Sequence, residues 1–194
     1  MQLQLVPFLG FFQEDPNHTI TPLRPNDQDY AMVGQCVPIT CTDLVFVDEN
    51  DCFVLPYRRN ACARGWWWKG GSIKAGMTFD KSYANLMKRE IGFVPEQLTF
   101  LANLHHFWAE RGEAPHEVGK HDVINLHYTK VDEATIAKIR LDPVEYEAER
   151  GFMRYDGTQE VRPVVHEAYR TYLALQNPEV KAAMQMLQAA LAKL

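Results

Sequence analysis

The sequence predicts an α/β domain, in which strands and helices share one hydrophobic core. Three observations favour this class: β-branched runs typical of strands, a capped helix over residues 79–91, and an amphipathic helix over residues 179–194. The chain has 194 residues, of which 46% are hydrophobic and 23% charged, close to the averages of globular proteins. This length predicts one domain with additions at its ends.

The N-terminal part is expected to be an arm that precedes the folded body. Residues 13–30 hold three prolines among polar residues, a composition that favours an extended segment. We therefore divide the chain into an arm over residues 1–29 and a domain over residues 30–194. The domain opens with β-branched residues from Val37 to Val47, and after a polar turn Phe53 to Leu55 predicts the second strand of a hairpin.

A helix over residues 79–91 is the best-marked element. Thr78 can cap its first turn through the side-chain oxygen, and Gly92 can end it. Two strands are expected over residues 98–108 and 123–130, with a polar loop over residues 109–120 between them. Helices are expected over residues 132–139, 166–175 and 179–194, so residues 156–194 form a helical extension of the domain.

Charge and composition exclude several classes of function. The formal net charge of −5 argues against binding nucleic acid through overall positive potential. No apolar run reaches the roughly 18 to 20 residues that span a bilayer, so we expect no membrane partner and a cytoplasmic protein. The four cysteines are spaced too irregularly for a zinc or redox site, and they are expected to be buried thiols.

Two carboxylates occupy positions that the core should fill. On the helix over residues 79–91, Glu90 follows Tyr83 at i+7 and so lies on the apolar stripe. Asp43 lies in a strand with two apolar faces, which predicts a central position in the sheet. A buried carboxylate needs a cation or hydrogen-bond donors. Either residue can instead be structural, Glu90 at a frayed helix end and Asp43 in an ion pair with arginine.

A basic cluster follows the hairpin. Arg58, Arg59 and Arg64 stand close together in an otherwise acidic chain, and a guanidinium can hold two phosphate oxygens at once. The cluster therefore indicates a site for a diphosphate. The alternative is a solvated loop edge in which an arginine stacks on one of the three tryptophans at 66–68.

The order of these features resembles a Nudix hydrolase. Gly71 opens the family's sequence box, and Glu90 through Phe93 closes it at the family's spacing. Three of the four box glutamates are replaced, by Met77, Leu86 and Arg89, so the box is degenerate. The resemblance covers roughly residues 29–155 and implies the Nudix α/β/α sandwich, with a mixed central sheet between helices.

A box reduced in this way resembles the GDP-mannose mannosyl hydrolase branch, whose members keep one metal-binding glutamate. The resemblance implies that Asp43 and Arg58 bind substrate, that Arg58 also serves catalysis, and that His106 is functional. A histidine beside phenylalanine and tryptophan can instead be a core residue. The branch's arginine after the first box glycine is replaced here by Ser72, so that contact is either missing or supplied by Arg59 or Arg64. The branch's glutamine and histidine of the late loop have no clear match here, so Glu147 or Glu149 is the candidate base or second metal ligand, and the alternative is that these glutamates are solvated.

The resemblance also implies a cofactor and a reaction. Mg²⁺ is expected on Glu90 and on the carbonyl of Gly70, and the substrate is a nucleoside diphosphate sugar such as GDP-mannose. Loss of three glutamates favours cleavage of the glycosyl C–O bond, which yields sugar and nucleoside diphosphate. The alternative is a Nudix-fold module that binds nucleotides or a partner without catalysis. The branch forms dimers through its N-terminal segment, so the resemblance predicts a homodimer in which the arm takes part.

Overall fold

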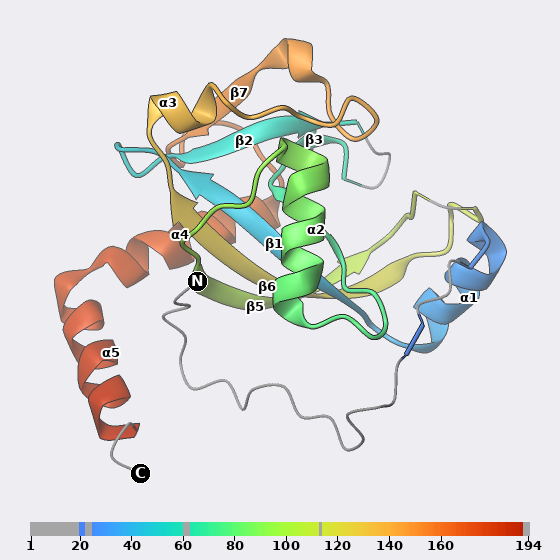
Figure 1. Cartoon of the computed structure of the whole chain (residues 1–194), viewed down its shortest axis with the longest axis horizontal. Helices are drawn as coiled ribbons and strands as arrows, with labels where there is room; N and C mark the ends of the chain where they lie inside the picture. Colours follow the sequence, from blue (N-terminus) through green and yellow to red (C-terminus); the bar gives the residue numbers. More distant parts are fainter. Residues whose placement is uncertain (1–19, 22–24, 60–62, 113, 192–194) are drawn as a thin grey trace.

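The computed structural model describes residues 20–21, 25–59, 63–112 and 114–191. Its elements follow one another along the chain as shown in Figure 1. They are α1 (Asp27–Cys36), β1 (Ile39–Val47), β2 (Phe53–Arg58), β3 (Gly65–Trp66), β4 (Lys69–Ser72), α2 (Phe79–Ile91), β5 (Thr99–Trp108), β6 (Lys120–Lys130), α3 (Glu133–Ile136), the 3-10 turn η1 (Ala148–Arg150), β7 (Phe152–Tyr155), α4 (Pro163–Gln176) and α5 (Pro178–Leu191).

Strand β1 is the centre of a mixed sheet, as its apolar faces predict. It pairs in parallel with β6 along its whole length and antiparallel with β4 at its start and β2 at its end. The order β3-β2-β1-β6-β5 runs across the sheet, β4 adds to β1, and β7 adds to β2. Because β1 is shared by three partners, residues on its first half meet both β4 and β6.

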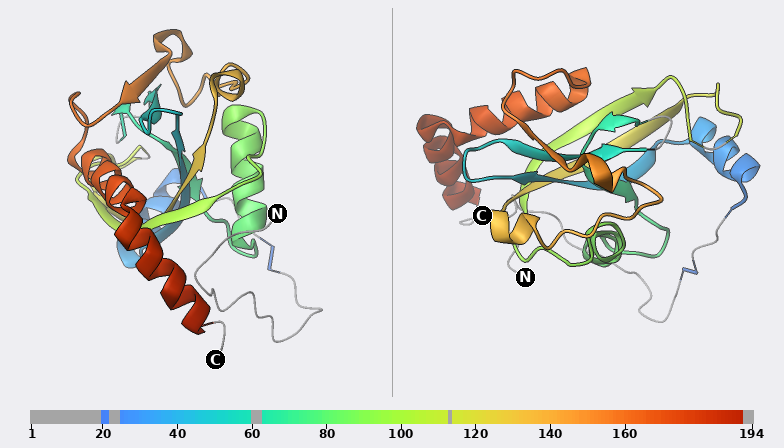
Figure 2. Two further views of the ribbon diagram at one scale, coloured as in Figure 1. Left: turned by 90° about the vertical axis from the view of Figure 1, so that its left-hand side faces the viewer. Right: turned by 90° about the horizontal axis from the view of Figure 1, so that it is seen from above.

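Helices cover both faces of the sheet, so the predicted α/β/α sandwich is confirmed (Figure 2). Helix α2 lies on one face, where its apolar stripe packs against Leu44 and Phe46 of β1. Helix α4 lies on the other face, where Tyr169 and Tyr172 pack in the cluster that contains Val45. Helix α5 continues from α4 and extends away from the sheet.

The box helix α2 has the predicted ends. The Thr78 side chain accepts a hydrogen bond from the Lys81 amide, and Gly92 ends the helix at a φ of 86°, a left-handed conformation that glycine adopts without strain. Glu90 is completely buried in this helix. The alternative of a carboxylate at a frayed, solvated helix end is therefore wrong.

Helix α1 corrects the expectation of an extended segment over residues 13–30. Asn26 caps it by accepting a hydrogen bond from the Asp29 amide, and Asp27 and Asp29 add favourable charge to the first turn. The three prolines of this segment made it look irregular, but all three precede Asn26, so none of them interrupts the helix. Residues 1–19 and 22–24 of the predicted arm, and with them its expected role in dimer formation, lie outside the described part.

Other boundaries moved by a few residues. The helix expected over residues 132–139 covers only Glu133–Ile136, and α4 begins at Pro163, because proline suits the first helical position. Among the cysteines, Cys41 is buried and Cys52 partly buried, but Cys36 is exposed, so the prediction of a buried thiol is wrong there. Cys62 lies outside the described part. No helix among the described residues is long and apolar enough to cross a membrane.

Candidate functional site

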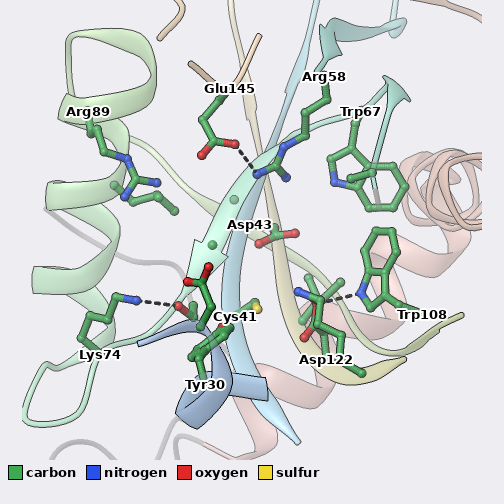
Figure 3. Close-up of a pocket in the computed structure, with 18 of the residues that line it drawn as sticks. Tyr30, Cys41, Asp43, Arg58, Trp67, Lys74, Arg89, Trp108, Asp122 and Glu145 are labelled. Carbon is green, nitrogen blue, oxygen red and sulfur yellow. Dashed lines mark hydrogen bonds and ion pairs between the residues drawn. The ribbon is translucent and has the colours of Figure 1, made fainter. Parts of the chain in front are cut away.

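A cavity of about 730 Å³ opens beside β4, between the box helix and the tryptophan-rich face of the sheet. Arg89 reaches toward it from α2, whereas Trp67 and Trp108 lie on the opposite side (Figure 3). Its lining combines acidic, basic and aromatic side chains: Tyr30, Asp43, Arg58, Trp67, Lys74, Arg89, Trp108, Lys120, Asp122 and Glu145. Such a mixture fits a ligand that carries both charge and hydrogen-bonding groups.

Asp43 lies at the centre of this cavity, where β1 pairs with β4. The indole N–H of Trp68 donates a 2.7 Å hydrogen bond to Oδ2, while Oδ1 is buried and accepts no hydrogen bond from a described residue. Gly70 is paired directly with Asp43, and a Cβ at Gly70 would lie 1.9 Å from Oδ1. Gly70 is therefore required by the close carboxylate, whereas its backbone has no positive φ.

Burial changes the acidity of Asp43. The side chain is only 5% exposed, and burial raises its pKa to about 7 although the Trp68 hydrogen bond and the charge of Arg58 lower it. The carboxylates of Glu90 and Asp122 add to the increase. Asp43 therefore exchanges a proton near neutral pH, which is the property of a general acid or base.

Arg58 ends strand β2 beside the same cavity. Its Nη2 donates a 3.2 Å hydrogen bond to Glu145, and its guanidinium lies 5.9 Å over the ring of Tyr146. Burial opposes the charge, but the phenol of Tyr146 and the nearby carboxylates, led by Glu90, raise the pKa of Arg58 above its usual value. The guanidinium is thus a fixed positive charge in the cavity wall, and it does not stack on residues 66–68.

Glu90 is neutralised within the chain. Arg89 Nη2 lies 2.8 Å from Oε1, and the Tyr146 hydroxyl donates a 2.5 Å hydrogen bond to Oε2. Lys69, on β4, is a second buried cation whose charge interacts with Glu90. Its ammonium donates to the Val54 carbonyl and lies 4.1 Å over the Phe46 ring, and burial lowers its pKa to about 7. Glu90 is therefore satisfied before any ligand binds.

The predicted magnesium set, Gly70 and Glu90, is not confirmed by this geometry. Mg²⁺ requires near-octahedral oxygen ligands and is usually bound by one or two carboxylates with an open coordination face. Both oxygens of Glu90 are occupied, and its side chain has no exposed surface. Within the described ranges no group of three His, Cys, Asp or Glu side chains is placed to hold a metal. As placed, these residues do not fit the ion.

Backbone pairing brings Tyr146 to the site. Residues 142–147 run along the end of β2, where the Arg59 amide donates to the Glu145 carbonyl and the Glu147 amide to the Tyr57 carbonyl. Tyr146 thereby bridges to Arg58 and points its hydroxyl at Glu90. We did not predict Tyr146, Glu145 or Trp68, because the partner that each of them contacts lies far away in the sequence. Arg89 was visible as a cation where the resembled box has a glutamate.

Besides Glu90, three predicted site residues do not line the cavity. His106 stacks on Trp108, with ring centroids 4.0 Å apart, and so supports a cavity wall from behind. Arg59 is half exposed and lies 3.9 Å from Glu149. Glu147 pairs with Arg150 at 2.5 Å. Direct roles for these three residues stay predictions.

The far end of the cavity contains a second buried carboxylate. Asp122 is 4% exposed, and its Oδ2 accepts a 2.7 Å hydrogen bond from the Trp108 indole and lies 3.1 Å from the Lys120 ammonium. Its Oδ1 is buried without a hydrogen-bond partner among the described residues. The parallel register pairs Asp122 with Ile39, four residues before Asp43, so the backbone positions of the two aspartates are offset by about 13 Å along the strands.

The fold matches solved structures of Nudix hydrolases. A MutT Nudix hydrolase from Burkholderia pseudomallei is 18% identical, with a TM-score of 0.54 over 70% of this chain and 98% of its own. An Ap4A hydrolase from C. elegans is 14% identical, with a TM-score of 0.52 over 71% and 96%. The MutT protein of Methanosarcina mazei Go1 is 16% identical, with a TM-score of 0.52 over 72% and 97%.

No protein-family model matches the chain, and no curated protein sequence matches it. At these identities the structural likeness defines the fold. The chain has the Nudix fold.

Proposed function

We propose that the chain hydrolyses a nucleoside diphosphate sugar, by attack of water on the anomeric carbon with departure of the nucleoside diphosphate. One observation carries this proposal: Asp43, with one free carboxyl oxygen and a pKa near 7, shares a cavity with the guanidinium of Arg58. The Nudix fold supports a phosphate-containing ligand, since two of the similar structures are named MutT proteins and one an Ap4A hydrolase.

Asp43 is the proposed general base. The Asp43 carboxylate would accept a proton from the attacking water as the water oxygen bonds to the anomeric carbon, while the Trp68 hydrogen bond holds the side chain in place. The bond from that carbon to the diphosphate oxygen breaks, and its electron pair leaves with the phosphate. The proton then passes from Asp43 to solvent. The products are the free sugar and the nucleoside diphosphate.

Arg58 and Arg89 are the proposed stabilisers of the leaving group. A diphosphate already carries negative charge, so it can leave without an acid if cations stabilise the charge that develops on it. Both guanidinium groups line the cavity, and each can donate hydrogen bonds to two phosphate oxygens. The pairing of each arginine with one carboxylate fixes its position and leaves further N–H groups for the ligand.

The far end of the cavity is the proposed place of the nucleobase. Trp108 is partly exposed and offers aromatic surface for stacking, and the unpartnered oxygen of Asp122 can accept a hydrogen bond from a ring N–H or an amino group. The backbone of Asp122 is offset from that of Asp43 by about 13 Å along the strands, far enough to separate a base from the reacting carbon. Guanine presents such donors, so GDP-mannose is the first substrate to test.

The test is product analysis in water enriched in ¹⁸O. The chain is incubated with a panel of nucleotide sugars, in parallel with chelator and with Mg²⁺, and the products are weighed by mass spectrometry. We expect ¹⁸O in the released sugar and none in the nucleotide. Label in a phosphate group would contradict the bond assignment. Binding of the nucleotide sugars with no release of sugar would instead support a module without catalysis.

A further inference from the structure

Arg89 occupies the position where the resembled box would supply a carboxylate. Its side chain is 55% exposed and lines the cavity, and its Nη2 lies 2.8 Å from the buried Glu90 carboxylate. Arg89 therefore places a positive charge where a metal-binding site needs a negative charge. The replacement therefore changes the sign of the charge at the cavity wall.

Glu90 has two neutralising partners from two different elements. Arg89 comes from the same helix, and Tyr146 comes from the loop that follows α3 and donates its hydroxyl to the other oxygen. A divalent ion would have to displace both partners, and the displaced Tyr146 hydroxyl would then be buried without an acceptor. This arrangement opposes metal binding more strongly than one ion pair on the surface would.

We propose that Arg89 replaces the divalent cation, so that the cavity binds a diphosphate through the guanidinium groups of Arg58 and Arg89 in the absence of metal. The identity of the ligand rests on the proposed function, but the prediction of metal independence does not. Arg89 suits this role because a guanidinium has five N–H donors, and the bond to Glu90 uses one of its nitrogens. Its partial exposure leaves the others accessible from the cavity.

The first test titrates MgCl₂ and MnCl₂ alone into the full chain by calorimetry. We expect no saturable binding to the wild type and a gain of binding in Arg89→Glu, which places a second carboxylate beside Glu90. Lys88→Glu is the matched control, because Lys88 is an exposed neighbour on the same helix and changes the net charge equally. Saturable Mg²⁺ binding to the wild type that is lost in Glu90→Gln would overturn the proposal.

The second test measures GDP affinity in chelator, with Arg89→Gln and the exposed control Lys88→Gln. We expect wild-type affinity to be the same with Mg²⁺ and with chelator, and Arg89→Gln to weaken it about 10- to 100-fold. Affinity that requires Mg²⁺, or that is equal in both variants, would contradict the role of Arg89. Circular dichroism of each variant separates loss of binding from loss of fold.

These outcomes are distinct from failure of the proposed function. Neither titration contains a nucleotide sugar, so a chain that releases no sugar can still bind GDP without metal. Conversely, a chain that hydrolyses nucleotide sugars only with bound Mg²⁺ would retain the proposed reaction and contradict the replacement by Arg89.

Discussion

Asp43 and Glu90 are both buried carboxylates near one cavity, but their surroundings differ. Glu90 has a partner on each oxygen, Arg89 and Tyr146, and no exposed surface. Asp43 has a partner on one oxygen, and its other oxygen is free while the side chain lines the cavity. The comparison shows that burial alone does not identify a catalytic carboxylate. An unpartnered oxygen is a second criterion, which Asp43 and Asp122 meet and Glu90 does not.

The largest effect that tests this difference is on catalysis. Asp43→Asn keeps the shape of the side chain and removes the base, so we expect kcat for sugar release to fall about 10²- to 10⁴-fold. The matched control is Asp122→Asn, the other buried carboxylate of the cavity, which we expect to raise KM with little effect on kcat. An Asp43→Asn enzyme with wild-type kcat would remove Asp43 from the mechanism.

The pH dependence of stability should separate Asp43 from an ordinary aspartate. The folded chain holds the Asp43 proton up to about pH 7, whereas the unfolded chain releases it near 3.8. The folded state therefore binds more protons between these values, and the free energy of unfolding should fall as pH rises, by up to about 4 kcal/mol. Urea unfolding at several pH values from 4 to 7 measures this decrease in the free energy of unfolding. Asp43→Asn should lose this decrease, and an identical decrease in the variant would contradict the assignment.

The hydrogen bond from Tyr146 to Glu90 can be tested by comparing Tyr146 with a second buried tyrosine, Tyr83. Tyr146→Phe leaves a carboxylate oxygen of Glu90 buried without its donor, so we expect a loss of about 1 to 3 kcal/mol in the free energy of unfolding. Tyr83 is equally buried, but its hydroxyl has no hydrogen-bond partner among the described residues, so Tyr83→Phe should cost little or stabilise the chain. Equal changes in the free energy of unfolding by urea would show that the hydrogen bond to Glu90 does not stabilise the fold.

Local signals in the sequence were sufficient for much of the fold. Helix α2 was predicted with its correct ends, because Thr78 and Gly92 are capping residues and the apolar spacing between them is helical. The central position of β1 followed from apolar residues on both faces. Helix α1 was missed, because its cap residue Asn26 comes directly after a proline-rich stretch and the helix is only weakly amphipathic.

The site was only partly predictable, because its chemistry depends on pairs that are distant in the chain. Asp43 was expected to pair with arginine or backbone N–H groups, but its direct partner is Trp68 on a loop 25 residues later. Tyr146 reaches Glu90 across 56 residues through a backbone pairing that no local pattern reveals. Gly70 was expected to bind Mg²⁺ through its carbonyl, whereas the structure requires a glycine there to make room for Asp43.

The most direct test of the contrast between Asp43 and Glu90 is the pH profile of kcat/KM for a hydrolysed nucleotide sugar, measured in chelator. If Asp43 is the base, its ionised form is the active one, so the rate should rise with pH and level off above about 7. The profile should be unchanged when Mg²⁺ replaces the chelator. A rate that does not change across this pH range would contradict the role of Asp43, whereas a rate that appears only with Mg²⁺ would contradict the replacement of the ion by Arg89.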